Sequence, residues 1–148
     1  MFFCKYSINA FASIIETTCS FEGRMAPLIV LSQELTSVHH DHIEIVMYDR
    51  GINIWHHYFS NNKPSWKLLS FIDMPLKIGK KHTMSVGVRF NKKGAFLFVK
   101  CRGQLLGSRI DTNWPKKYYV GITGCEGKNS FYNFSVKEEK ETNPALLE

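Results

Sequence analysis

The sequence predicts an all-β fold, a two-sheet antiparallel jelly-roll sandwich. Of the 148 residues, 44% are apolar and 14% are aromatic, and bulky aromatic residues suit the pleated, half-buried surface of a strand. Short apolar segments recur between turn residues, a spacing typical of sandwiches and barrels. No segment keeps a helical period. We therefore expect a strand-dominated chain with very little helix.

The chain is long enough to bury one apolar core without disulfides or a structural metal. We predict a single sandwich domain over residues 1–137 and a C-terminal tail over 138–148. The apolar start is interpreted as a first strand, because it lacks the ordered basic and apolar regions of a secretory signal. The expected strands cover residues 2–9, 13–21, 28–32, 42–49, 52–59, 66–72, 83–90, 95–102, 105–110, 118–123 and 130–137.

Two hairpins are especially clear in the sequence. The first turns through Asn91-Lys92-Lys93-Gly94, where glycine permits a left-handed conformation. The strand before it alternates apolar and other residues, so one face is predicted to lie inward: Met84, Val86, Val88 and Phe90.

The second hairpin turns at Arg50-Gly51, a register that would place Tyr48 opposite Asn53 and Glu44 opposite His57. One face then carries an apolar set, Ile43, Ile45, Met47, Ile52 and Ile54. The other face carries His42, Glu44, Tyr48, Asn53, Trp55 and His57. A slip of one residue would expose the apolar set to water, so the pattern itself supports the assignment of faces.

The polar face of this hairpin is the predicted ligand site. Sugar recognition needs a flat aromatic ring and convergent polar groups. Trp55 and Tyr48 can supply the rings, and the polar groups come from His42, Glu44, Asn53 and His57. We therefore expect a glycan as the partner. Trp66 is predicted to pack in the core, and Trp114 to lie in a loop at one end of the sandwich. The alternative for both is that they extend a glycan groove.

A metal site is the alternative for the same region. His40, His42 and Glu44 alternate along one strand face, with His57 across from them, and imidazole with carboxylate can hold zinc or iron. The pattern resembles the cupins, a jelly-roll family of metal enzymes, although cupins place their Glu further from the second His. Our primary prediction assigns no metal and no other cofactor.

The segment from 79 to 136 resembles a known superfamily. Lys81 to Val88, then Leu97 to Gly103, and finally Tyr118 to Ile122 with Phe131 to Phe134 are similar to strands of the concanavalin A-like lectin/glucanase superfamily in its laminin-G-like form. The resemblance implies a jelly roll and a lectin-like, non-catalytic carbohydrate-binding role. Lys100, Cys101 and Arg102 stand where that family often has an Asp before its glycine, so the resemblance does not imply a calcium site.

Catalytic patterns are weak in this chain. The Glu-x-Asp-x-x-Glu strand of the superfamily's hydrolases is absent from the sequence, and Glu44 and Asp49 would point to opposite faces of a regular strand. A hydrolase- or lyase-related domain therefore stays an alternative to a binding module. The four cysteines have no CxxC spacing and are interpreted as free thiols.

The net charge of +6 makes this a basic protein, and a basic chain raises nucleic acid or an acidic glycan as possible partners. Many lysines fall in predicted loops, where they keep strand edges solvated, so nucleic acid is not favoured. No apolar run reaches the length of a transmembrane helix. No motif assigns a compartment or an oligomeric state.

Overall fold

The structure, a computed structural model, describes residues 4–23, 25–34, 41–110, 113–124 and 127–139. Its regular elements there are β1 (Cys4–Asn9), β2 (Ala12–Phe21), β3 (Met25–Ser32), β4 (His42–Tyr48), β5 (Gly51–Ser60), β6 (Lys63–Asp73), β7 (His82–Asn91), β8 (Gly94–Cys101), β9 (Gln104–Arg109), β10 (Lys117–Thr123) and β11 (Asn129–Glu139). This part of the chain holds no helix that is long and apolar enough to cross a membrane.

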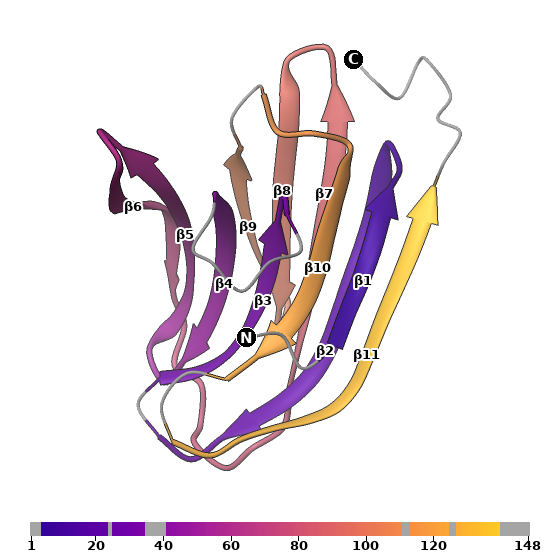
Figure 1. The fold of residues 1–148 in the computed structure, drawn as a ribbon. Helices are drawn as coiled ribbons and strands as arrows, with labels where there is room; N and C mark the ends of the chain where they lie inside the picture. The colour runs from indigo at the N-terminus through magenta and orange to yellow at the C-terminus, as the bar shows by residue number, and fades with distance from the viewer. Residues whose placement is uncertain (1–3, 24, 35–40, 111–112, 125–126, 140–148) are drawn as a thin grey trace.

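The strands form two antiparallel sheets that face each other (Figure 1). The six-stranded sheet has the order β1-β10-β3-β4-β5-β6, and the five-stranded sheet has the order β11-β2-β7-β8-β9. The chain crosses between the sheets at its two ends, through β1, β2 and β3 and again through β9, β10 and β11, and once in the middle, from β6 to β7. Strands from the two ends of the chain therefore pair with each other, β1 with β10 and β2 with β11. The predicted jelly-roll sandwich is confirmed.

The core lies between the inward faces of the two sheets. The alternating apolar sets predicted on both hairpins are buried, among them Ile45 and Ile54 from one sheet and Val86 and Val88 from the other. Burying a side chain of this size contributes roughly 1.5–3 kcal/mol relative to leaving it in water. Trp114, in the segment between β9 and β10, is only 4% exposed and packs beside Tyr118.

The hairpin of β4 and β5 has a different register from the predicted one. Tyr48 pairs with Gly51 and Val46 with Asn53, so the turn residues are Asp49 and Arg50. Gly51 has a φ of +146°, and a Cβ there would collide with the carbonyl oxygen of Ile72. The glycine is therefore required at the first paired position of β5 and not within the turn. The shift is two residues, an even number, so every side chain keeps its predicted face.

Some predicted boundaries also change. β6 begins at Lys63, three residues before the prediction, and β11 runs to Glu139, so the sandwich includes two residues assigned to the tail. Residues 140–148 lie outside the described residues. The β7–β8 turn is as predicted: Asn91 pairs with Gly94, and the Asn91 side-chain oxygen accepts a 2.7 Å hydrogen bond from the backbone N–H of Lys93.

Two of the cysteines can be assigned. Cys19 and Cys101 are buried free thiols, as the sequence predicts. Burial, together with the neighbouring Cys101, raises the pKa of Cys19 to about 12. Such a thiol is an inert core residue rather than a nucleophile. Cys125 lies outside the described residues.

Candidate functional site

The outward side chains of β4, β5 and β6 form one continuous surface, which we call the β4–β6 face. Strand pairing aligns its residues in rows: His42 with His57 and Trp66, then Glu44 with Trp55 and Leu68. The sequence-predicted site residues all lie on this face, namely His42, Glu44, Tyr48, Asn53, Trp55 and His57.

A hydrogen-bonded cluster lies on the β4–β6 face near the start of β4. The two carboxylate oxygens of Glu44 each lie 3.1 Å from an imidazole Nε2, one from His42 and one from His57. Burial by itself would raise the pKa of Glu44, but the hydrogen bonds from both imidazoles and their charges outweigh it and lower the pKa to about 2. Glu44 is therefore a carboxylate at neutral pH, positioned by two neighbouring strands.

The same three side chains are the possible metal ligands of this face. Their ligand atoms all lie within 4.8 Å of one another, and two imidazoles with a carboxylate match the donor set of many zinc sites. His40, the fourth residue of the predicted alternative, lies outside the described residues. Both carboxylate oxygens already accept hydrogen bonds, so the cluster is satisfied by its own protein groups.

Aromatic side chains flank this cluster. Trp55 is half-buried and packs against a small apolar group on the same side of the sheet, formed by Leu28 and Val30 of β3 and Val46 of β4. Trp66 is 63% exposed, so the prediction that it packs in the core is wrong. An exposed indole next to hydrogen-bonding groups offers a flat apolar surface of the kind that stacks on a sugar ring.

Tyr48 lies at the other end of the face. It pairs with Gly51 beside the turn, whereas His42 pairs with His57 six residues further along β5, which corresponds to roughly 20 Å of strand. The Tyr48 ring lies 6.3 Å from that of Phe71, and both line a hollow of about 530 Å³ with Asp49, Arg50 and Asp73. The structure thus brings His42, Glu44, Trp55 and His57 together and places Tyr48 apart from them.

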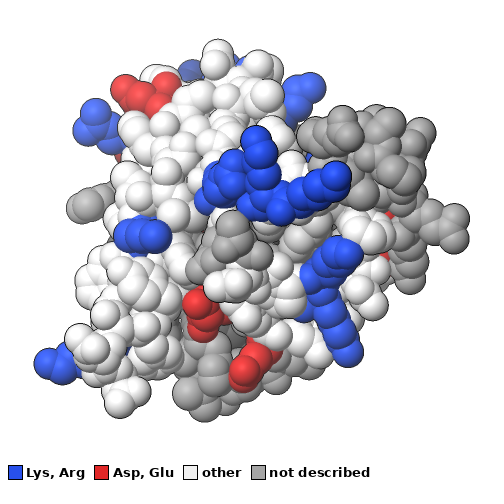
Figure 2. All heavy atoms as spheres, turned by 90° about the horizontal axis from the view of Figure 1, so that it is seen from above, with Lys and Arg blue, Asp and Glu red and all other residues white. Residues whose placement is uncertain are grey.

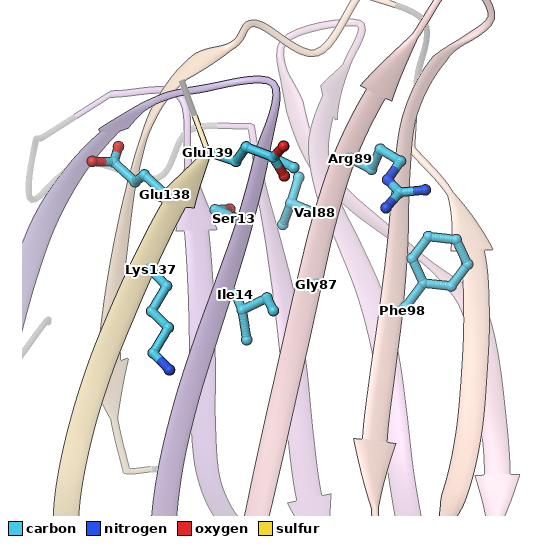
Figure 3. Close-up of a pocket in the computed structure, with 10 residues that line it drawn as sticks. Ser13, Ile14, Gly87, Val88, Arg89, Phe98, Lys137, Glu138 and Glu139 are labelled. Carbon is cyan, nitrogen blue, oxygen red and sulfur yellow. The ribbon is translucent and has the colours of Figure 1, made fainter. Parts of the chain in front are cut away.

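The five-stranded sheet carries a separate hollow on its outer surface, with a volume of about 420 Å³. Ile14 and Phe98 lie on either side of Gly87, and Arg89, Lys137 and Glu139 lie around them (Figure 3). This hollow has apolar walls with charges at its rim. The β4–β6 face, in contrast, combines aromatic rings with a hydrogen-bonding cluster.

Comparison with known proteins gives a consistent answer for the fold. The sequence matches no protein-family profile and no curated protein. The structure is similar to a carbohydrate-binding module, CBM66 from Bacillus subtilis, with a TM-score of 0.62 and 8% identity over 92% of this chain and 78% of that one. It is also similar to sheep galectin-11 in complex with glycerol, with a TM-score of 0.63 and 8% identity over 90% of this chain and 96% of that one.

A third similar structure is alginate lyase A1-II′ of polysaccharide lyase family 7. The TM-score is 0.61 and the identity 12%, over 90% of this chain and 65% of the lyase. The chain has the concanavalin A-like jelly-roll fold. At these identities the similarity shows the fold alone, and the jelly-roll fold that the sequence resemblance implied is confirmed.

Sequence reasoning left Trp66 out of the predicted site, because it favoured the core for this residue over a glycan groove. The strand that carries it begins at Lys63 and forms an edge of the six-stranded sheet. Lys63, Pro64 and Lys67 in the sequence are the signal that could have revealed this, because lysine and proline are typical of edge strands.

Proposed function

We propose that this protein is a non-catalytic glycan-binding module whose ligand lies on the β4–β6 face. The observation that carries the proposal is the position of Trp66. Its indole is 63% exposed, and it pairs across the strands with His57, a member of the His42–Glu44–His57 cluster.

The chemistry of this face suits a sugar. The apolar side of a pyranose ring stacks on an indole, and the ring hydroxyls both donate and accept hydrogen bonds. Glu44 can accept from hydroxyls, the imidazoles can donate to them, and Asn53 can do both. Trp55 is aligned with Glu44 across the strands and packs against the apolar group of Leu28, Val30 and Val46, where it can extend the stacking surface.

The arrangement of carboxylates supports binding rather than hydrolysis. Among the described residues of the β4–β6 face, the carboxylates are Glu44 and Asp73. Glu44 is aligned with Trp55, and Asp73 is aligned with Gly51, four residues away along β5. That offset is roughly 13 Å along the strand, beyond the about 5–9.5 Å that separates the two carboxyl groups of glycosidases.

The comparisons support a carbohydrate ligand at the level of fold. Two of the similar structures are named as a carbohydrate-binding module and a polysaccharide lyase. A lyase-like activity is the alternative within this fold. Incubating the protein with the polysaccharides that it binds, and measuring absorbance from new unsaturated ends, would distinguish the two.

A glycan array with two matched variants tests the proposal. Trp66→Ala removes the exposed indole, and Leu105→Ala removes an equally exposed apolar side chain, 63% in both cases, from the other sheet. We expect Trp66→Ala to lower glycan affinity by about 10- to 100-fold, as for an aromatic hot spot, and Leu105→Ala to leave it unchanged. Equal affinities for the parent and Trp66→Ala would contradict the proposed site.

A further inference from the structure

A group of exposed cations gathers at one end of the sandwich: Arg89, Lys92, Lys93, Arg109, Lys116 and Lys117. We call it the cationic end. Lys92 and Lys93 form the turn between β7 and β8. Arg109, at the end of β9, donates a 3.0 Å hydrogen bond from Nη1 to the backbone oxygen of Lys93. The guanidinium of Arg109 also lies 4.7 Å from the ring centre of Phe96, which fixes its position.

Lys117, the first residue of β10, and Lys116, just before it, belong to the same end. The Lys116 ammonium lies 3.6 Å from the ring centre of Phe11, and the backbone oxygen of Phe11 accepts a 2.8 Å hydrogen bond from the N–H of Phe90. Phe90 is one residue before the end of β7. Figure 2 looks down on this end and shows a band of Lys and Arg side chains across the middle of the surface.

In the described part of the chain, fewer carboxylates than cations lie near this band. The described acidic residues closest to it along the strands are Glu34, Asp41, Glu138 and Glu139. Glu138 already accepts hydrogen bonds from the Asn9 N–H and the Tyr6 hydroxyl, and Asp41 is bound to His56. The cations outnumber these acids, so the end attracts anions at neutral pH.

The cationic end is continuous with the β4–β6 face. A row of paired residues runs across the sheet from Trp66 through His57, His42 and Ser32 to Tyr119. Four strand spacings cover about 19 Å. Lys117 lies two residues before Tyr119 in β10, on the same outward side. A chain of sugars that stacks on Trp66 and follows this row therefore leads to Lys117.

We propose that the glycan recognised is anionic, and that the cationic end holds its carboxylate or sulfate groups while the β4–β6 face holds its sugar rings. This inference rests on the proposed glycan-binding function. A nucleic acid would also seek cations and aromatic rings. The hydrogen-bonding cluster of His42, Glu44 and His57 favours a glycan, because sugar hydroxyls can donate to its carboxylate and accept from its imidazoles.

The test uses two triple variants with the same change in charge. Lys92→Ala/Lys93→Ala/Lys117→Ala removes cations from the cationic end and spares Lys116, which packs on Phe11. Lys77→Ala/Lys80→Ala/Lys128→Ala removes exposed lysines from the opposite end of the sandwich and spares Lys81, whose ammonium lies 4.2 Å from the ring centre of Tyr132. Thermal melting of both variants verifies that they are folded.

Binding is measured to a heparin octasaccharide, to its fully desulfated form, to an oligogalacturonate and to single-stranded DNA. We expect the first triple variant to lose about tenfold or more in affinity for the octasaccharide, and the second to stay within about twofold. The loss should shrink as salt rises, because exposed charges are screened. Comparing the octasaccharide with oligogalacturonate shows whether sulfate or carboxylate is preferred.

Three results would overturn the inference. Equal losses in the two triple variants would mean that overall charge, not the cationic end, attracts the ligand. Tighter binding of DNA than of the octasaccharide would assign the end to nucleic acid. Binding of neutral glycans on the array, with no binding of the octasaccharide or the oligogalacturonate, would refute the anionic ligand and leave the glycan-binding function intact. Failure of the function itself looks different: Trp66→Ala would then bind the octasaccharide and its desulfated form as the parent does.

Discussion

The imidazole rings of His42 and His57 are stacked on neighbouring strands, with ring centres 4.6 Å apart and planes inclined by only 4°. Both rings direct Nε2 to the carboxylate of Glu44. The stacking and the two hydrogen bonds hold three polar side chains in one arrangement before any ligand binds. Such preorganisation lowers the entropic cost of binding, because these side chains need not be ordered when the ligand arrives.

The cluster predicts a specific dependence of stability on pH. The pKa of Glu44 is lowered from 4.5 to about 2 in the folded protein. Its carboxylate therefore contributes stability above pH 4.5, and that contribution is lost as the pH falls toward 2. We expect the free energy of unfolding to fall by roughly 1–3 kcal/mol over this range because of Glu44 alone.

Glu44→Gln isolates this contribution. Chemical denaturation of the parent and the variant between pH 2 and pH 7 should show two curves that lie apart at neutral pH and converge in acid. All other carboxylates are common to both proteins, so their effects cancel in the difference. Two curves that remain parallel down to pH 2 would show that Glu44 is not stabilised by the imidazoles.

Metal removal is predicted to have little effect. Both oxygens of Glu44 accept hydrogen bonds from the imidazoles, so the cluster needs no cation to balance it. We expect a chelator to leave the melting temperature unchanged. Added zinc should raise the melting temperature only slightly, in contrast to the large rise that a tightly bound structural ion produces. Stoichiometric metal in the purified protein, with melting lowered by the chelator, would establish the cupin-like alternative instead.

The two tryptophans of the face should differ in their effect on stability. Trp55 packs on Leu28, Val30 and Val46, whereas Trp66 is mostly exposed. Trp55→Ala should therefore lower the free energy of unfolding by about 1–3 kcal/mol, less than a fully buried tryptophan would. Trp66→Ala should change it by no more than about 0.5 kcal/mol. Urea denaturation of both variants measures the difference, and a larger loss for Trp66→Ala would place that residue in the core.

Much of the fold could be predicted because alternation is a local property of the sequence. Ile43 and Ile45 alternate with His42 and Glu44, and this pattern separates the core from the β4–β6 face. The register could not be predicted in the same way. It depends on Gly51, whose need for glycine comes from the backbone of Ile72, a residue of the next strand. A contact between distant residues of the chain is invisible to turn statistics.

Trp66 was missed for a related reason. Leu68 and Leu69 are adjacent in the sequence, and an apolar pair beside a tryptophan is typical of a core strand. The pairing of β5 with β6 shifts between Ile54 and Trp55, so that Leu68 is exposed while Leu69 packs against the core. A bulge interrupts strict alternation and re-aims the side chains on one side of it. This places Trp66 on the outer face.

The role of Gly51 leads to a matched pair of substitutions. Gly51→Ala would force a methyl group against the Ile72 carbonyl at a φ of +146°, whereas Gly79→Ala meets nothing within 4 Å at a φ of +81°. Gly79→Ala should cost about 1–2 kcal/mol from the backbone conformation alone. Gly51→Ala should cost clearly more, because the collision adds to that strain. Equal melting temperatures for the two variants would contradict the assigned register.

The central claim, that a glycan lies on the β4–β6 face, is tested most directly by the three tryptophan indoles. Trp55 and Trp66 lie on this face, and Trp114 is buried in the core. In ¹H–¹⁵N spectra each indole N–H gives its own signal, so the protein carries its own control. Titration with the tightest-binding glycan from the array should shift the signals of Trp55 and Trp66 and leave that of Trp114 in place. Unchanged Trp55 and Trp66 signals at saturating glycan, with shifts confined to amides of β2, β7 and β8, would move the binding site to the opposite sheet.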